Sequence, residues 1–197
     1  MATVEQKFAI VCDEHHKYFV NGKPKMGLTE CLKEAGLVEF IGDNTEAMFR
    51  GKAGHKATEL LDAGKLDWSS VTDSLMGYVL AYESFIENSG WRPLERELMM
   101  YSPALDICTT IDGRYELPGG DRTICEIKTG EVLQPYTRYQ TALQHEICKH
   151  NALYAERRHA ILLRSDSTYQ LTEFRKPTDL IVGVSAVNVA KAKRGLL

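Results

Sequence analysis

The chain has 197 residues, of which 44% are hydrophobic and 26% charged, and its formal net charge at pH 7 is −3. This composition is typical of a globular protein that can bury a core without disulfides or metals, and it excludes disordered and fibrous classes. Acidic residues outnumber basic ones before residue 130, and the reverse holds after it. Because no linker-like segment separates these two parts, we predict a single domain spanning residues 1–197.

Two features bear on the compartment. No apolar run approaches the ~20 residues that a membrane span needs, and residues 1–10 lack the pattern of a secretion signal. The five cysteines are odd in number and include no C-x-x-C pair. We therefore expect a cytoplasmic protein with no membrane partner.

The first half of the chain predicts one strand and several helices. Residues 18–20 alternate like a strand, and Asn21-Gly22 is typical of a tight hairpin turn. Serine and threonine favour helix starts and glycine favours helix ends. On these signals helices are predicted from Thr29 to Gly36, from Thr45 to about residue 61, and from Ser69 or Ser70 to Gly90.

The second half of the chain alternates like a sheet. Strands are predicted over residues 94–101, 107–115 and 122–128, a helix over 135–149, a hairpin of 159–163 with 169–174, and a last helix from about 177. This order predicts an α/β or α+β fold with a central mixed sheet flanked by helices.

One predicted hairpin places two carboxylates together. Asp112 and Glu126 are equidistant from residue 119, which lies in the turn formed by residues 118–120. If the turn centres there, the two side chains face each other with Cβ atoms about 5 Å apart. They would repel each other unless a divalent cation lay between them. We therefore expect that removing Asp112 slightly stabilises the metal-free protein.

Lys128 extends this pair into a possible site. It shares a strand face with Glu126, while Ile127 points into the core. Carboxylates suit Mg²⁺, and a neighbouring lysine can hold a water or a phosphate. The alternative is a solvated hairpin face with a cross-strand Glu–Lys pair.

Asp112 followed by Glu126-Ile127-Lys128 resembles the D…(D/E)-x-K signature of the PD-(D/E)XK nuclease superfamily. Gly51 to His55 is similar to the G-x-x-x-H element of the RecB-like branch, and Gln140 to its glutamine motif. Glu97 is similar to an acidic residue of phage-type exonucleases, although Glu95 shares its face by alternation.

The resemblance implies a restriction-endonuclease-like core with an N-terminal helical part. It also implies Mg²⁺- or Mn²⁺-dependent hydrolysis of DNA, most closely by an exonuclease of phage recombination, repair or replication type. His55, Asp112, Glu126 and the Ile127 carbonyl would hold the metal, and the imidazole favours Mn²⁺ beside Mg²⁺.

In the same scheme Lys128 would position or activate water, with Glu97 and Gln140 completing the catalytic site. Two alternatives stay open: a structure-specific endonuclease on the same site, and a catalytically silent module that binds DNA or protein.

The resemblance also implies DNA as the partner, at an end or a single-stranded region, with a recombination or replication protein as a second partner. A phage-encoded protein would act in the host cytoplasm. The family's tyrosine four residues after the glutamine is replaced here by Gln144. The candidate DNA contacts are Arg50, Lys52, Lys56, Tyr136, Arg138, Tyr139 and Gln144, and after them Lys149, Arg157, Arg158 and the tail residues Lys191, Lys193 and Arg194.

The cysteines and one histidine pair are further possible metal ligands. Some relatives bind an iron–sulfur cluster through a clustered C-terminal cysteine trio, which this sequence lacks. We therefore predict no iron–sulfur cluster. His15-His16 near Cys12 does not have zinc-site spacing, so a loop is predicted there.

Overall fold

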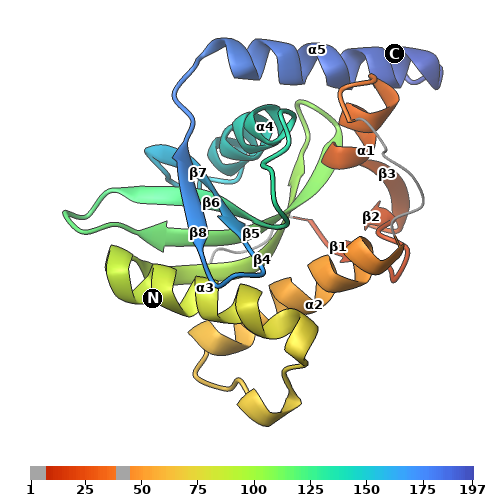
Figure 1. Ribbon diagram of the computed structural model, residues 1–197. Coiled ribbons are helices and arrows are strands. Elements are labelled where there is room, and N and C mark those ends of the chain that lie inside the picture. Colours follow the sequence, from red (N-terminus) through yellow and green to blue (C-terminus); the bar gives the residue numbers. More distant parts are fainter. Residues whose placement is uncertain (1–7, 39–44) are drawn as a thin grey trace.

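The computed structural model describes residues 8–38 and 45–197 (Figure 1). Within these ranges the chain forms one mixed eight-stranded sheet with helices on both faces. This arrangement confirms the predicted α/β class with a restriction-endonuclease-like core. None of the helices in the described ranges combines the length and the apolar character required to cross a bilayer.

The strands follow the order β1-β2-β3-β5-β6-β7-β8, and β4 pairs with the other side of β5. They are β1 (Ile10–Cys12), β2 (Tyr18–Val20), β3 (Lys23–Gly27), β4 (Arg92–Ser102), β5 (Ile107–Glu116), β6 (Arg122–Thr129), β7 (Arg157–Leu163) and β8 (Tyr169–Glu173). The meander β4-β5-β6 is antiparallel, whereas β3 with β5 and β6 with β7 are parallel.

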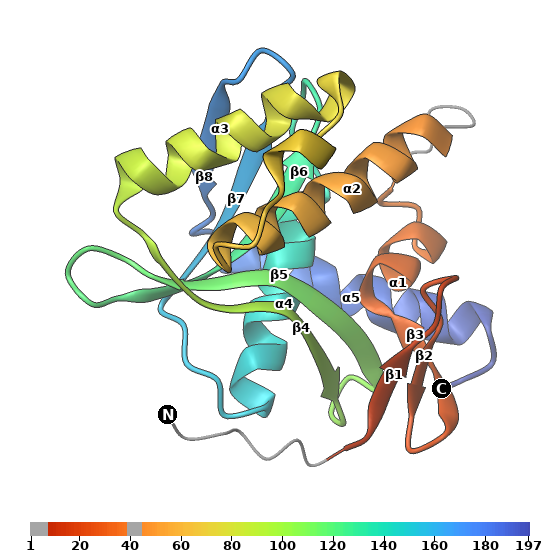
Figure 2. The same ribbon diagram turned by 90° about the horizontal axis from the view of Figure 1, so that it is seen from below.

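The helices form a layer on each face of the sheet. They are α1 (Leu28–Glu34), α2 (Thr45–Asp62), α3 (Asp73–Ser89), α4 (Thr137–His150) and α5 (Thr178–Lys193). One face carries α2 and α3, and the other carries α4 with α1 and α5 beyond it (Figures 1 and 2). The side chains of α4 and α3 pack into two separate cores, one on each face. Because α4 connects the parallel strands β6 and β7, it must cross one face of the sheet.

The predicted hairpin register is confirmed. Backbone pairs run from Glu116 with Arg122 to Gly113 with Cys125, so the turn centres on residue 119. Gly119 has a φ of 103°, a left-handed conformation that glycine adopts at low cost. Asp112 and Glu126 occupy the next positions beyond the last of these pairs.

The expectation that Glu95 and Glu97 share a face is wrong. The β4–β5 pairing passes from Arg96 with Gly113 to Leu98 with Ile111, and Glu97 has a φ of 48°. Alternation is therefore interrupted: Arg96 points toward α2 and α3, while Leu98 packs into the core beneath α4. The strand irregularity turns Glu97 away from the face that Glu95 occupies.

Several helix starts also differ from the predicted ones. Thr29 lies inside α1, whose N-cap is Gly27, because the Glu30 carboxylate accepts the Gly27 N–H at 3.1 Å. Residues 68–70 form a short 3₁₀-helix, and α3 has Thr72 as its N-cap. Thr45 is the first residue of α2, and its side chain lies outside the described part.

Burial of His159 on β7 predicts acid sensitivity. Its Nδ1 lies 2.7 Å from the Thr123 hydroxyl, and its ring packs edge-on against Trp91. Burial lowers the pKa of His159 from 6.5 to about 4. The unfolded chain therefore binds this proton more readily, and stability falls as the pH drops from about 6.5 toward 4.

We expect thermal unfolding at pH 7.5 and pH 4.5 to show a larger loss of stability for the wild type than for His159→Gln. Equal losses in the two proteins would assign the acid sensitivity to other groups.

Candidate metal centre

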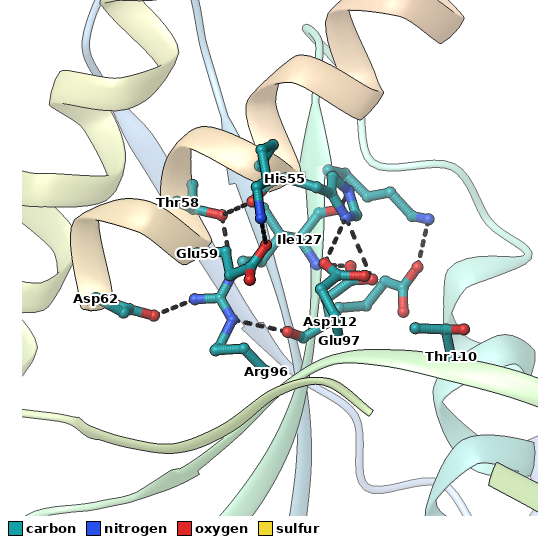
Figure 3. A network of polar contacts seen from close by, with 12 residues as sticks. His55, Thr58, Glu59, Asp62, Arg96, Glu97, Thr110, Asp112 and Ile127 are labelled. Atoms are coloured by element: carbon teal, nitrogen blue, oxygen red, sulfur yellow. Dashed lines mark hydrogen bonds and ion pairs between the residues drawn. The ribbon is translucent and has the colours of Figure 1, made fainter. Parts of the chain in front are cut away.

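Three candidate residues come from three structural elements that meet where β5 and β6 stop pairing. Asp112 lies on β5, Glu97 on β4, and His55 on α2, which packs over this end of the sheet (Figure 3). Gly54 allows this approach of α2, since a Cβ there would lie 3.0 Å from the Thr129 side chain on β6. The fold thus brings a helix residue to two carboxylates on adjacent strands.

His55, Glu97 and Asp112 form a convergent set of donors. The Nδ1 atom of His55 lies 3.5 Å from Glu97 Oε1 and 3.3 Å from Asp112 Oδ1. Its Nε2 atom lies 3.0 Å from the Ile127 carbonyl. A proton placed on Nε2 donates to that carbonyl and leaves the Nδ1 lone pair facing both carboxylates. The three ligand atoms lie within 4.8 Å of one another, so a single cation can contact all three.

The positive and negative groups at the site shift each other's pKa values. Burial lowers the pKa of His55, but Asp112 and Glu97 outweigh it and raise that pKa to about 10. Burial raises the pKa of Asp112, but His55 and Lys128 outweigh it and hold that pKa below its ordinary value. Without a metal, a proton on His55 offsets the two carboxylates. A bound cation would replace this proton, because a histidine ligand must be neutral.

The surroundings of one buried oxygen of Glu97 indicate whether a cation fits this site. Glu97 Oε1 is shielded from solvent and, apart from its 3.5 Å approach to His55 Nδ1, has no hydrogen-bond donor among the described residues. Such an oxygen is costly unless a ligand satisfies it. One imidazole nitrogen with two carboxylate oxygens suits Mn²⁺ or Mg²⁺, so the residues fit the predicted metal.

Glu126 and Lys128 form a second group beside this set. Glu126 is only 3% exposed, and its Oε1 accepts from Lys128 Nζ at 2.6 Å and from Gln140. Burial and Asp112 raise the pKa of Glu126, against the opposing charge of Lys128. Burial lowers the pKa of Lys128, but Glu126 outweighs it, so the pKa rises and the ammonium stays charged.

The structure groups the candidate ligands differently from the sequence-based expectation, which stays a prediction. Glu97, expected as a catalytic residue, joins His55 and Asp112, whereas the oxygens of Glu126 already accept hydrogen bonds from three side chains. The Ile127 carbonyl lies 3.0 Å from His55 Nε2 and can orient the imidazole.

Gln144 was a candidate DNA contact, but its side chain is 0% exposed and does not reach the surface. Its Nε2 donates to Glu126 Oε2 at 2.8 Å and to the Thr110 carbonyl at 3.2 Å. Gln140 lies one turn earlier on α4 and donates to the other oxygen of Glu126. Both glutamines therefore hold the Glu126 carboxylate in place.

The aromatic and basic candidates at the start of α4 are Tyr136, the N-cap residue, and Arg138 and Tyr139 in the first turn. Lys128 Nζ lies 5.9 Å from the centre of the Tyr136 ring. The Arg138 guanidinium stacks on the Tyr139 ring at 4.6 Å and donates to its hydroxyl. Tyr136 is thus close to the site.

The basic candidates divide into two groups. Lys52 and Lys56 on α2 are exposed beside His55 and line one hollow with it, and Arg50 lies 5.6 Å over the Tyr78 ring. In contrast, Arg158 is buried against Asp179 at 2.6 Å, so the expectation that it contacts phosphate is wrong.

The other, more distant basic candidates have acidic partners, as Lys56 also does in Glu59 at 2.8 Å. Arg157 pairs with Asp121 at 2.7 Å, and Lys149 with Glu146 at 2.9 Å. In the C-terminal tail Arg194 pairs with Glu34 at 2.5 Å. Arg157 and Lys149 line a separate hollow with Arg158, away from the candidate metal ligands.

Two hollows open beside the site. The larger, about 800 Å³, is lined by Thr110 and Gln140, and the smaller, about 480 Å³, by His55 and Glu97. His16, in the turn between β1 and β2, lines both. The Tyr18 hydroxyl holds β2 against β5 through the Thr110 hydroxyl at 3.0 Å. Sequence reasoning missed these wall residues, although Thr110 shares the alternation of Asp112.

Comparisons with known proteins give fold-level likeness at low identity. No family model matches the chain, and no curated protein matches it. A candidate exonuclease from Eubacterium rectale is 12% identical, with 89% of this chain and 77% of that chain covered and a TM-score of 0.47. An alkaline exonuclease from Laribacter hongkongensis is 13% identical, with 83% and 85% covered and a TM-score of 0.48. At these identities and TM-scores the likeness by itself assigns neither family nor activity to this chain.

The contacts of Asp112 reverse the expected effect of removing it. Its Oδ2 accepts the Ile127 N–H at 2.7 Å, and its Oδ1 faces His55, so attraction outweighs repulsion from Glu126. We expect Asp112→Ala to destabilise the metal-free protein by about 1–3 kcal/mol, the cost of losing buried partners. Urea unfolding with EDTA present measures this, and a stabilised variant would restore the repulsion argument.

Proposed function

We propose that this protein is a divalent-metal-dependent deoxyribonuclease, most closely an exonuclease of the phage recombination or replication type, acting in the cytoplasm. One observation carries the proposal: His55, Glu97 and Asp112 converge beside a half-buried lysine that is paired with a buried carboxylate. A solvated hairpin face would not bury Glu126 among three donors. The alternative of an ordinary cross-strand pair is therefore less favoured by the geometry.

Mg²⁺ or Mn²⁺ bound by His55, Glu97 and Asp112 would stabilise the negative charge that develops on a scissile phosphate. The chain's own residues supply the proton chemistry. Lys128 stays protonated and donates from Nζ to a phosphate oxygen or a water. Glu126, fixed by Gln140 and Gln144, would hold the Lys128 ammonium in position beside the reacting phosphate.

In this proposal the substrate is a DNA strand that lies in the two hollows beside the site. Lys52 and Lys56 line the hollow that contains His55 and would neutralise phosphates there. Tyr136, near Lys128, would contact a base or sugar. A recombination or replication protein would be a further partner.

Cleavage of two DNA substrates tests the proposal. End-labelled linear duplex and closed circular DNA are incubated with protein and Mg²⁺, Mn²⁺ or excess EDTA. Metal-dependent loss of the linear substrate alone supports an exonuclease, and cleavage of both supports the structure-specific endonuclease. Full cleavage in EDTA contradicts the metal site, and binding without cleavage under any condition favours the silent module.

A further inference from the structure

Arg96 is a buried guanidinium that lies directly behind the candidate ligands (Figure 3). Its Nε donates to the Asp112 backbone carbonyl at 2.8 Å. Its Nη2 donates to the Thr58 hydroxyl at 2.8 Å, and that hydroxyl donates in turn to the His55 carbonyl at 2.9 Å. One side chain is thus linked to the backbones of two of the three ligand residues.

The remaining ligand residue, Glu97, follows Arg96 directly in β4. Glu97 and Asp112 lie opposite each other between the backbone pairs Arg96–Gly113 and Leu98–Ile111, but do not themselves form a pair. Arg96 supplies a donor to the Asp112 carbonyl where the strand ladder is interrupted. It therefore connects the two irregular strand positions from which the carboxylates project.

The other nitrogen of Arg96 anchors this link to the helices. Nη1 donates to Asp62 on α2, to the Tyr82 hydroxyl on α3 at 2.6 Å and to the Tyr115 hydroxyl on β5 at 3.0 Å. Thr58 and Asp62 are one turn apart on α2, so Arg96 holds this helix at two points. The helix can then neither slide nor rotate past the strands without breaking charged hydrogen bonds.

We propose that Arg96 is a positioning residue that sets the relative placement of His55, Glu97 and Asp112, so that their donor atoms converge on one divalent cation. The inference rests on the metal site of the proposed function. It assigns to Arg96 an effect on metal affinity beyond its effect on stability. A planar guanidinium with five donors can bridge helix and strands in this way, whereas a lysine ammonium cannot.

Mn²⁺ titration calorimetry on the full chain tests the proposal, with circular dichroism and urea unfolding for each variant. Arg96→Lys keeps the positive charge next to Asp62 but loses the bridge, and we expect its Mn²⁺ affinity to fall about 10–100-fold, as for other residues that orient metal ligands. Asp62→Asn is the control, because it weakens the ion pair and leaves the links from Arg96 to Asp112 and Thr58. It should lose stability while its Mn²⁺ affinity remains close to that of the wild type.

A folded Arg96→Lys variant with wild-type affinity overturns the proposal. So does an equal loss of affinity in Asp62→Asn, because affinity would then only follow stability. If Arg96→Lys fails to fold, Thr58→Val and Thr58→Ser decide: the valine removes the hydroxyl that joins Arg96 to His55, and the serine retains it. Weaker Mn²⁺ binding by the valine variant alone supports the proposal, and equal binding overturns it.

Mn²⁺ binding and DNA cleavage by the wild type distinguish a failure of this proposal from a failure of the proposed function. A wild type that binds no Mn²⁺ overturns the metal site and the inference together. A wild type that binds Mn²⁺ and cleaves DNA, with variants that bind equally well, overturns the role of Arg96 alone.

Discussion

Lys128→Met is expected to lower the rate of DNA cleavage about 10²–10³-fold, which is typical when one charged donor to the reacting group is removed. Metal affinity should be unchanged or slightly higher, because the Lys128 charge opposes a cation at the neighbouring carboxylates. The substitution is therefore expected to slow the cleavage step without weakening metal binding. Single-turnover cleavage of a labelled duplex, with Mn²⁺ calorimetry on the same sample, separates the two effects.

Lys149→Met provides the matched control for this change. Lys149 also pairs with a glutamate, Glu146 at 2.9 Å, but lies outside the site. Its variant should cleave at the wild-type rate. If Lys128→Met also cleaves near that rate, the lysine only neutralises Glu126, and the proposed mechanism is wrong.

Glu97→Gln is expected to weaken Mn²⁺ binding about 100-fold or more and to remove most cleavage. The substitution replaces an anionic oxygen of the convergent set with a neutral amide of similar size, so packing is kept while the ligand charge is lost. Calorimetry with Mn²⁺ measures the affinity, and thermal unfolding confirms that the variant is folded.

The same strand offers a control for Glu97. Glu95 pairs with Arg114 at 2.6 Å, and Glu95→Gln should bind Mn²⁺ as the wild type does. If the Glu95 variant loses as much affinity as the Glu97 variant, the loss reflects the charge of the strand and the assignment of Glu97 as a ligand fails.

The local pattern of the sequence determined most of the longer elements and the hairpin register. Alternation with period two and the glycines of the turn are local signals, so the strands on either side of residue 119 and their register followed directly. The same holds for the helix ends at Gly36 and Gly90, where a left-handed backbone favours glycine. These features require no knowledge of distant contacts.

Helix α4 shows that local sequence signals predict the position of a helix but not which of its side chains are buried. Its position was predicted to within two residues, but Gln144 was expected to contact DNA and is instead buried against Glu126. The face that a helix presents to a sheet depends on how the helix packs, which period and composition do not specify when polar residues point inward. The sequence identified the residue types of the site more readily than their roles.

Only the tertiary structure showed that Glu97 lies close to His55 and Asp112. Glu97 and Asp112 do not form a backbone pair between β4 and β5, and the left-handed backbone of Glu97 interrupts the alternation where its side chain faces His55. Regular alternation would have placed Glu97 with Glu95. The interruption is held by Arg96, whose hydrogen bonds reach Thr58 on α2 and the Asp112 carbonyl on β5. Because these contacts join residues far apart in the chain, no local pattern predicts them. The pairing of the hairpin residues, in contrast, could be predicted from their spacing alone.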